Sequence, residues 1–335
     1  MSAIRAEAEA EARRLVRSEW GADHDIRDFG PMADGHAGLS FGFRIVQGER
    51  TVDDVVLRLA PKGVRRAGNT DVYRQAPLLR ALHAAGVRVP PVVMAQESED
   101  WFSVPFVMTR KLPGRTMIIW EPGDEFRTRP GLIREGWLTS AAALADIHRF
   151  DWQAHLPDWE KPRDLDAEIA RWRPILEKTD EPDWIAAGLE VADMIAASTP
   201  PPSPVGLLHG DFQPGNVLFD QGEIVAFLDW ELAGIGPQLL DIGWLLMMGD
   251  PESWEPSWAA REVPTGAELV AAYEGAMGQH FPGIPWYQAL SNYIFGVISC
   301  LNVKLHRTGR RPDPMWDDIA PSVPYLFGKA KTLLR

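Results

Sequence analysis

The sequence is poor in cysteine and in positive charge, and no apolar run in it reaches the length of a transmembrane helix. Cys300 is the one cysteine among 335 residues, which excludes a disulfide framework and a cysteine-based zinc site. Lys and Arg number 34 against 47 Asp and Glu, for a formal net charge of −13. Nucleic-acid-binding proteins normally present a basic face, so we expect no nucleic-acid partner, while the acidic balance suits a cationic ligand.

The N-terminal residues lack the apolar core of a signal peptide. Met1–Arg17 is instead rich in Ala, Glu and Arg. Together with the missing transmembrane run, this composition predicts a cytoplasmic protein without a membrane partner. Residues 3–20 have the pattern of a charged amphipathic helix that ends at Gly21. The length of the chain predicts two structural units, and nothing in the composition indicates an oligomeric state.

Two apolar runs in the second half of the chain predict a β-hairpin. The runs, Val217–Phe219 and Ile224–Leu228, flank the polar segment Asp220–Glu223, whose Gly222 is typical of a hairpin turn. Antiparallel pairing would fold the end of the second strand back beside the start of the first. Residues at the two outer ends of the hairpin are therefore expected to lie close together.

Three polar residues occur at or near these ends: Asp211, Asn216 and Asp229. Protein kinases place a base and two magnesium ligands in this order, as an Asp, an Asn five residues later and an Asp beyond a hairpin. The residue types suit the chemistry, because a carboxylate can accept the proton of an attacking hydroxyl and hard oxygens hold Mg²⁺ against phosphates. Asp and Asn are also ordinary turn residues, but the order, spacing and hairpin together favour the catalytic interpretation.

The motif His-Gly-Asp-Phe-Gln-Pro-Gly-Asn at His209–Asn216, followed by Phe-Leu-Asp-Trp-Glu at Phe227–Glu231, resembles the aminoglycoside phosphotransferase family. These kinase-like enzymes also include choline and macrolide kinases, and the sequence looks most like the branch related to the kinase domains of some acyl-CoA dehydrogenases. The resemblance runs from about Phe29 onward. It implies an α+β, bilobal protein-kinase-like fold, with a small antiparallel-sheet N-lobe (1–108), a hinge (109–114) and a mainly helical C-lobe (115–335).

The resemblance also implies an ATP- and Mg²⁺-dependent phosphotransferase that acts on a hydroxyl of a small molecule. Asp211 would be the catalytic base, and Asn216 and Asp229 would hold the metal. Arg58 would clamp the phosphates. The other residues implied at the nucleotide site are Gly35, Gly38, Ser40, Gln75, Thr109 and Lys111.

The acceptor implied by the family is an aminoglycoside-like, amino-alcohol, macrolide or hydroxyacyl compound. Only a short segment separates Asp229 from Asp241. A protein kinase needs a longer activation segment at this point to dock a peptide, so the short segment favours a small-molecule acceptor.

Two positions depart from the family pattern. The family usually carries Ser or Asn in its glycine turn, where this chain has Ala37 and Gly38, so only backbone contacts to phosphate are expected there. The glutamate that normally steadies the phosphate-binding cation is matched by Gln75. A neutral amide offers Arg58 no charge assistance, so we expect a mobile Arg58 in the free protein unless another acid, such as Glu125, substitutes.

Two other functions remain open. The pairing of Arg58 with Gln75 suggests a nucleotide-binding pseudokinase with a regulatory or scaffold role, which an intact Asp211 argues against. The segment Gly38–Gly42 matches the nucleophile elbow of hydrolases, with Ser40 as the nucleophile. That motif requires a helix after the Ser, whereas Phe43–Val46 has the pattern of a strand.

Periodicity predicts the remaining elements: strands at 54–59 and 101–108, and helices at 71–85, 132–148, 269–277, 287–303 and 323–334. Asp241 is expected to be a helix N-cap, and it also resembles the family aspartate that ties down the catalytic loop. His148 is expected to be structural. The C-terminal region offers candidates for the acceptor pocket, each of which also fits an ordinary surface: Asp250, Glu252, Glu255, Trp286 and Tyr287.

Overall fold

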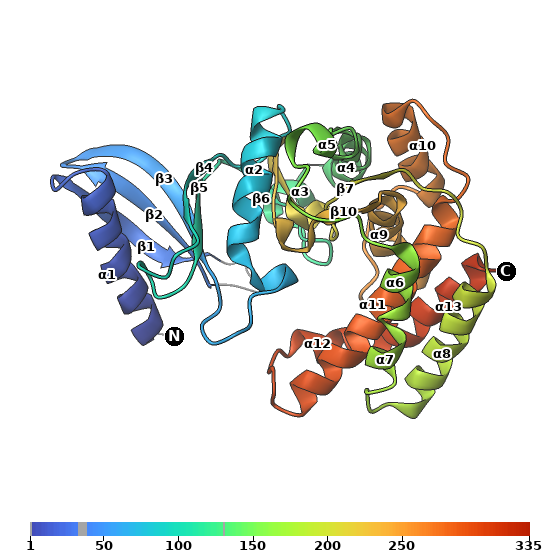
Figure 1. Cartoon of the computed structure of the whole chain (residues 1–335). Helices are drawn as coiled ribbons and strands as arrows, with labels where there is room; N and C mark the ends of the chain where they lie inside the picture. Colours follow the sequence, from blue (N-terminus) through green and yellow to red (C-terminus); the bar gives the residue numbers. More distant parts are fainter. Residues whose placement is uncertain (1, 33–38, 130) are drawn as a thin grey trace. The chain divides into compact units, whose positions relative to one another are not determined.

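The structure, a computed structural model, describes residues 2–32, 39–129 and 131–335. The chain divides into two compact units, and Figure 1 labels most of their helices and strands. Unit 1 consists of Met1–Arg115, Gln153–Trp159 and Val225–Leu232, and unit 2 of Thr116–Trp152, Glu160–Ile224 and Ala233–Arg335. The first boundary falls beside the expected hinge, and two short segments from later in the chain also join unit 1.

Unit 1 contains, in its described residues, a five-stranded antiparallel sheet with the strand order β1-β2-β3-β5-β4. Its strands are β1 (His24–Pro31), β2 (Leu39–Gln47), β3 (Arg50–Leu59), β4 (Val92–Gln96) and β5 (Phe106–Arg110). The sheet confirms the predicted antiparallel N-lobe. The predicted start of a strand at residue 101 is wrong, because Phe102 and Ser103 both have a left-handed φ of 56°. At its other end β5 includes Thr109, which the sequence places in the hinge.

Helix α1 (Ser2–Glu19) covers one face of this sheet. Side chains alternate along β3, so that Val55 and Leu57 are buried while Arg58 stays partly exposed on the opposite face. Ala12 and Leu15 of α1 belong to the same buried cluster as Val55 and Leu57. The helix confirms the prediction for residues 3–20, and it leaves the face that carries Arg58 uncovered by α1.

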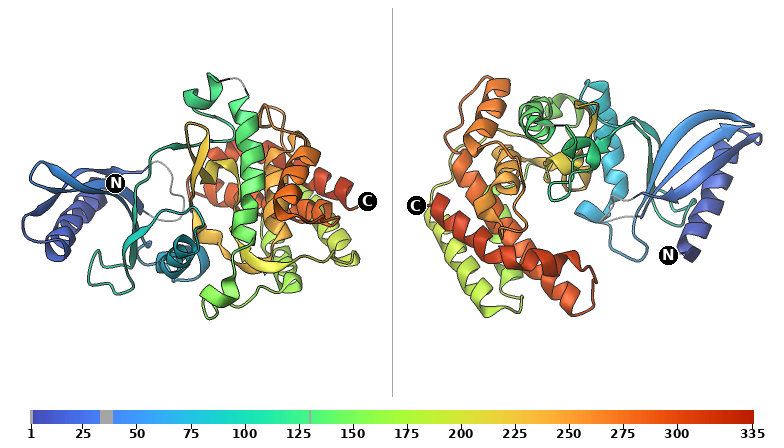
Figure 2. Two further views of the ribbon diagram at one scale, coloured as in Figure 1. Left: turned by 90° about the horizontal axis from the view of Figure 1, so that it is seen from above. Right: turned by 180° about the vertical axis from the view of Figure 1, so that it is seen from behind.

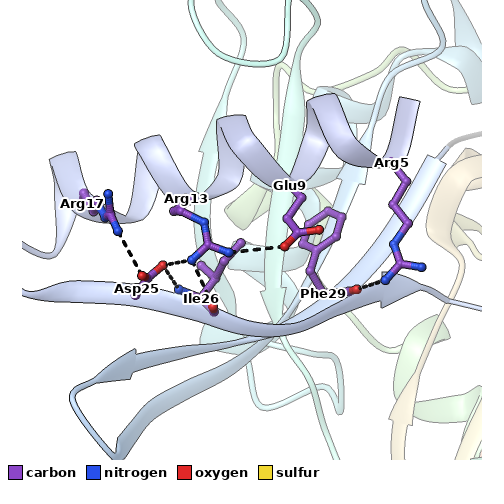
Figure 3. Close-up of polar contacts among 7 residues, drawn as sticks. All are labelled: Arg5, Glu9, Arg13, Arg17, Asp25, Ile26 and Phe29. Atoms are coloured by element: carbon purple, nitrogen blue, oxygen red, sulfur yellow. Dashed lines mark hydrogen bonds and ion pairs between the residues drawn. The ribbon is translucent and has the colours of Figure 1, made fainter. Parts of the chain in front are cut away.

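Polar contacts also join α1 to β1, as Figure 3 shows. Arg17 donates to the Asp25 carboxylate at 3.0 Å, and Arg13 contacts the same carboxylate. Arg5 donates to the main-chain oxygen of Phe29 at 2.6 Å. Exposed ion pairs typically contribute no more than about 1 kcal/mol each, so apolar packing is the main force that holds α1 on the sheet.

The remaining elements of unit 1 come from several separate parts of the chain. They are η1 (Gly68–Thr70), η2 (Val72–Arg74), α2 (Gln75–Ala84), most of α5 (Trp152–His155) and η4 (Trp230–Leu232). The predicted helix at 71–85 therefore opens with a 3-10 turn. The segment Val225–Leu232 is anchored in unit 1 by the N–H of Phe227, which donates to the main-chain oxygen of Arg88 at 2.8 Å.

Unit 2 is mainly helical, which confirms the predicted C-lobe. Its longer helices are α4 (Leu132–His148), α8 (Pro182–Ala197), α9 (Leu239–Gly249), α10 (Gly266–Met277), α11 (Ile284–Arg307) and α13 (Val323–Leu333). Shorter helices are α3 (Asp124–Arg127), α6 (Leu165–Ala170), α7 (Arg173–Leu176) and α12 (Met315–Ile319), with 3-10 turns η5 (Pro251–Ser253) and η6 (Ala320–Ser322). Helix α11 packs against α9 and α13, and α13 lies beside α8 (Figure 2). Within the described residues, none of these helices is both long enough and apolar enough to span a membrane.

The predicted hairpin is present. Strands β8 (Val217–Asp220) and β9 (Glu223–Phe227) are neighbours in a small sheet with β6 (Arg115–Thr116). Gln221 and Gly222 join them and have φ of 53° and 95°. Positive φ at both central residues defines the turn type that suits the twist of a two-residue hairpin. In unit 2, β7 (Val205–Leu208) and β10 (Gly234–Pro237) form a separate antiparallel pair. The segment His209–Asn216 follows β7 directly.

Candidate active-site residues

The segment His209–Asn216 leaves the buried strand β7 and ends in η3 (Pro214–Asn216), directly before β8. Gly210 has a φ of 86°, which a residue with a side chain rarely adopts, so a glycine suits this turn better than the arginine of protein kinases. Asp211 follows at once. Its carboxylate is therefore placed by a tight turn at the end of a strand that is fixed in the core.

Two neutral donors hold the Asp211 carboxylate. The Trp244 indole Nε1–H donates to Oδ1 at 2.7 Å, and the Asn216 Nδ2 donates to Oδ2 at 2.9 Å. The same Asn216 nitrogen donates to the main-chain oxygen of Asp211 at 2.8 Å. Both Asn216 bonds use the amide nitrogen, so its amide oxygen is left as the atom able to coordinate a metal. Unit 2 thus brings together two of the predicted site residues, together with a tryptophan that the sequence analysis missed.

Asp241 fixes the backbone of the same loop. Its carboxylate accepts the N–H of His209 at 2.7 Å and the N–H of Gly210 at 2.8 Å. Burial alone would raise the pKa of Asp241, but the hydrogen bond and charge of His148, with the contacts from His209, hold it below its ordinary value. The N-cap prediction is wrong, because Gln238 occupies the N-cap of α9 and Asp241 lies within the first turn.

His148 connects this aspartate to a second buried group. Its Nε2 lies 3.2 Å from Asp241 Oδ2, and its Nδ1 lies 2.8 Å from the hydroxyl of Tyr273. Burial raises the pKa of Tyr273, so its hydroxyl stays protonated and polar contacts remain intact at neutral pH. The structural role expected for His148 agrees with this position.

Arg58 in unit 1 is held by two carboxylates rather than by an amide. Its Nη1 lies 2.8 Å from Asp229 Oδ1, and its Nη2 contacts the Glu231 carboxylate. Burial alone would lower the pKa of Arg58, but these two carboxylates raise it. Arg58 is therefore not the mobile, unbalanced cation expected with Gln75 as its partner, because another acid substitutes. That acid is Glu231, to which the sequence analysis gave no role, and not Glu125.

Asp229 and Glu231 belong to a strained and well-anchored segment. Asp229 has a φ of 57°, a left-handed conformation that aspartate tolerates better than most residues but that still costs free energy. Arg74 donates to the main-chain oxygen of Glu231 at 3.0 Å, and the Trp230 indole donates to that of Phe227. Strain of this kind is concentrated at functional sites, which agrees with the predicted role of Asp229.

Gln75 is the first residue of α2 and is buried. Its Nε2 has no hydrogen-bond partner among the residues that the structure describes. Arg58 donates hydrogen bonds to Asp229 and Glu231. Among the described residues, Gln75 is not one of its hydrogen-bond partners.

The face of the sheet that carries Arg58 also carries Ser40 and Thr109, two of the other nucleotide candidates. Ser40 pairs with Arg58 across β2 and β3, and Thr109 pairs with Val56 across β5 and β3, so each pair shares a face. The Lys111 N–H donates to the main-chain oxygen of Asp54 at 2.7 Å, which removes this backbone donor from adenine recognition. Gly35 and Gly38 lie outside the described residues.

A pocket of about 220 Å³ opens beside this face, wholly within unit 1. The residues that line it are Asp28, Gly30, Pro31, Met32, Gly42, Phe43, Arg44, Asp54 and Lys111. A Cβ atom at Gly42 would lie 2.7 Å from the sulfur of Met32, so the glycine makes room for the methionine at the pocket wall. The side chain of Lys111 thus remains a candidate contact, although its backbone N–H is already used.

Ser40 cannot serve as the nucleophile of a hydrolase elbow in this structure. It lies inside β2, and the strand continues beyond it to Gln47. A nucleophile elbow requires a sharp turn from strand to helix at the serine. The hydrolase interpretation therefore has no structural support.

The candidates for the acceptor pocket mostly have structural partners. Asp250 and Glu252 both pair with Lys329, and Asp250 also accepts from Gln288. The Trp286 indole donates to Ser198, and the Tyr287 hydroxyl donates to the main-chain oxygen of Pro201. Trp286 and Tyr287 are buried. These contacts favour packing and surface roles for all four residues.

The model of the phosphotransferase enzyme family matches residues 36–286, which is more than half of the chain. The chain therefore belongs to this family. It is 26% identical over 265 residues to a homoserine kinase of Xanthobacter autotrophicus, covering 75% of this chain and 76% of that protein. It is 29% identical over 194 residues to acyl-CoA dehydrogenase family member 10 of Mus musculus, a match that covers 57% of this chain but only 18% of the mouse protein.

Solved structures share the fold. A protein of Ralstonia eutropha classed with the aminoglycoside phosphotransferases superposes with a TM-score of 0.75 at 21% identity, covering 96% of this chain and 98% of that one. A thermostable mutant of aminoglycoside phosphotransferase APH(4)-Ia, bound to ADP and hygromycin B, gives a TM-score of 0.61 at 15% identity, covering 97% and 98%. Family and fold together place the chain among the phosphotransferases.

Proposed function

We propose that this kinase uses ATP and Mg²⁺ to phosphorylate a hydroxyl group of a small molecule, with Asp211 as its catalytic base. The acceptor oxygen attacks the γ-phosphorus, a new O–P bond forms, and the bond to the β,γ-bridging oxygen breaks to release ADP. The hydroxyl proton passes to Asp211. The observation that carries the proposal is the position of Asp211, whose carboxylate is oriented by two neutral donors that leave its negative charge in place.

Each oxygen of a carboxylate has two lone pairs. The bonds from Trp244 and Asn216 go to different oxygens of Asp211, so both oxygens are held in place. This arrangement suits a base that must be held still and yet accept a proton.

The donor set fits Mg²⁺, which prefers oxygen ligands and commonly binds through one or two protein groups together with substrate phosphates. We assign Asn216 and Asp229 as its ligands, from the motif and from the amide and carboxylate oxygens that they offer. When bound, Mg²⁺ neutralises charge on the β- and γ-phosphates. Arg58 supports the same phosphates as a cation on the face of the unit 1 sheet that lies opposite α1.

The pseudokinase alternative has lost its main argument. It rested on an Arg58 left without a charged partner by Gln75, whereas two carboxylates hold Arg58 in the structure. The acceptor class is tested by a screen that measures ADP release with ATP and Mg²⁺ and one compound from each group: an aminoglycoside, an amino alcohol, a macrolide and a hydroxy acid or hydroxyacyl compound. We expect one group to raise ADP release above the acceptor-free rate. No rise with any group would contradict the proposal.

Asp211→Asn tests the base. Turnover should fall by about 10²-fold or more, the usual scale for loss of a general base, while calorimetry should show nearly unchanged ATP affinity. Asp220→Asn is the matched control, because Asp220 lies at the end of β8 in the same unit and has no assigned role. Equal turnover in the Asp211 and Asp220 variants would remove Asp211 from the mechanism.

A further inference from the structure

Helix α9 places two side chains on consecutive parts of the catalytic loop. Asp241 and Trp244 are three residues apart, so they project from the same side of the helix. Asp241 accepts the backbone N–H groups of His209 and Gly210, and Trp244 donates to the side chain of the next residue, Asp211. One helix face therefore contacts three successive loop residues, two through their backbone and one through its carboxylate.

The position of this helix face is set by a close approach to α11. A Cβ atom at Gly243 would lie 2.6 Å from the main-chain carbon and oxygen of Tyr287, which is closer than a real side chain could come. Gly243 therefore lets the two helix backbones touch. It directly precedes Trp244, so the contact fixes the point from which the indole reaches Asp211.

Aromatic packing fixes the indole ring itself. Trp244 is 8% exposed, and its ring meets the edge of Phe295 at 5.6 Å between centroids, with an interplanar angle of 87°. Phe295 in turn packs against Trp254 at 5.4 Å. Edge-to-face pairs of this kind restrict ring rotation. The indole N–H thus points at Asp211 because the helix contact and the aromatic packing both hold it there.

We infer that Trp244 is a positioning residue for phosphotransfer, whose indole N–H holds the carboxylate of Asp211 in the orientation that accepts the acceptor's proton. The inference rests on the proposed function, in which Asp211 is the base. A lysine or arginine at this position would also orient Asp211, but its positive charge would lower the basicity of the carboxylate. An indole donates a hydrogen bond without adding a charge, which is the property that the position requires.

The simpler explanation is that a buried tryptophan only needs some acceptor for its N–H. Trp254 provides the matched control. It lies in the same aromatic cluster, it is 1% exposed, and its indole donates to the main-chain oxygen of Met247 at 3.0 Å. Trp244→Phe and Trp254→Phe therefore remove the same group from similar surroundings, and only the first removes a contact to Asp211.

The kinetic experiment compares these two variants, using whichever acceptor the ADP-release screen identifies. Trp244→Phe should lower kcat by about tenfold, the scale of one hydrogen bond to a charged group, and leave the KM for ATP unchanged. In an Asp211→Asn background the same substitution should have no further effect. A Trp244→Phe variant with the same kcat as Trp254→Phe would overturn the inference.

The hydrogen bond can also be tested without an acceptor. In a ¹H–¹⁵N spectrum, the indole signal of Trp244 is the one missing from Trp244→Phe. We expect that signal to shift in Asp211→Ala and the signal missing from Trp254→Phe to stay in place. An unmoved Trp244 signal would overturn the inference even if the Trp244 variant folds poorly. By contrast, wild-type protein that transfers phosphate to no acceptor would overturn the proposed function, and the spectrum would still decide whether Trp244 binds Asp211.

Discussion

In unit 1 the carboxylates of Asp229 and Glu231 pair with the guanidinium of Arg58. In unit 2 the carboxylate of Asp211 instead accepts hydrogen bonds from the Trp244 indole and the Asn216 amide. The two arrangements have different consequences. A cation neutralises the carboxylates that it holds, and an incoming metal must compete with it for them. Neutral donors orient a carboxylate and leave its charge available. If Asp229 binds the metal and Asp211 is the base, as proposed above, the metal ligand must exchange Arg58 for the metal, whereas the base keeps its two partners throughout.

The two groups of charged residues also differ in how deeply they are buried. The side chains of Arg58, Asp229 and Glu231 are 16%, 25% and 12% exposed, so solvent and ligands can reach them. Asp241, which holds the catalytic loop of unit 2, is 1% exposed. A buried carboxylate with several fixed donors cannot exchange partners without a large cost. We therefore expect substitutions in the unit 2 network to affect folding most, and those in unit 1 to affect ligand binding.

Asp241→Asn disrupts the buried contacts of Asp241 with the His209 and Gly210 N–H groups, and it should have the largest effect on stability. The amide keeps one acceptor oxygen but turns a donor toward the loop N–H groups, so we expect a loss of about 3 kcal/mol in the free energy of unfolding at pH 7, measured by urea denaturation. Asp318→Asn, on the exposed side of α12, is the control. Equal unfolding curves for the two variants would show that the loop does not depend on Asp241.

The pH dependence of stability sharpens the same test. The pKa of Asp241 in the folded protein lies below its ordinary value of 3.8, so the unfolded chain takes up this proton first as the pH falls. The stabilisation from this carboxylate is therefore present above about pH 3.8 and is lost as the pH falls below it. The wild-type protein should lose stability over this range more steeply than Asp241→Asn. Parallel acid profiles would contradict the assignment.

Arg58→Met removes the ion pairs with Asp229 and Glu231 in unit 1. ATP should bind at least about tenfold more weakly, because a charge-assisted phosphate contact is lost. Asp229 and Glu231 would keep their charges without the cation, so Mn²⁺ alone, used as a probe for Mg²⁺, should bind more tightly than to wild type. Calorimetry measures both. The unpaired acids should also cost about 2 kcal/mol of stability.

Arg27→Met is the control for Arg58, since Arg27 lies in the same sheet but forms an exposed pair with Glu49. It should leave ATP and Mn²⁺ binding as they are in wild type. If Arg58→Met binds ATP like wild type, Arg58 is not the phosphate clamp, and the pseudokinase interpretation gains support. If Mn²⁺ binding does not rise, the cation does not compete for the two acids.

The sequence was sufficient for features that depend on neighbouring residues. The hairpin turn at Gln221 and Gly222 and the bounds of α4 follow from local propensity and periodicity. The partners of Arg58 and Asp211 did not follow. Glu231 is separated from Arg58 by 173 residues, and Trp244 from Asp211 by 33. Contacts over such distances depend on how the elements pack.

Some signals for these contacts were nevertheless present. Glu231 follows Asp229 by two residues, so an acid was available beside the metal-ligand candidate once Gln75 had failed to match the family glutamate. Trp244 follows Asp241 by three, which places both on one face of a predicted helix. The first signal lies outside the helix of Gln75, where the family pattern places the partner of the phosphate-binding cation. The second depends on the start of the helix, which lies at Leu239 and not at the predicted Asp241.

Gln75→Met offers the smallest effect, and Gln75→Glu the finest test of the comparison. Its buried Nε2 has no partner among the described residues, and Arg58 already has two carboxylates. Gln75→Met removes the unsatisfied donor at similar volume and should change stability by less than about 1 kcal/mol. Gln75→Glu adds a buried charge that Arg58 does not need, and it should cost about 1 to 3 kcal/mol. ATP affinity should change by less than tenfold in both, because neither residue would contact the phosphates. Thermal unfolding and calorimetry decide the matter: a Gln75→Glu variant that is more stable than wild type, or that binds ATP more tightly, would mean that Arg58 is underbalanced and that Gln75 does act on it.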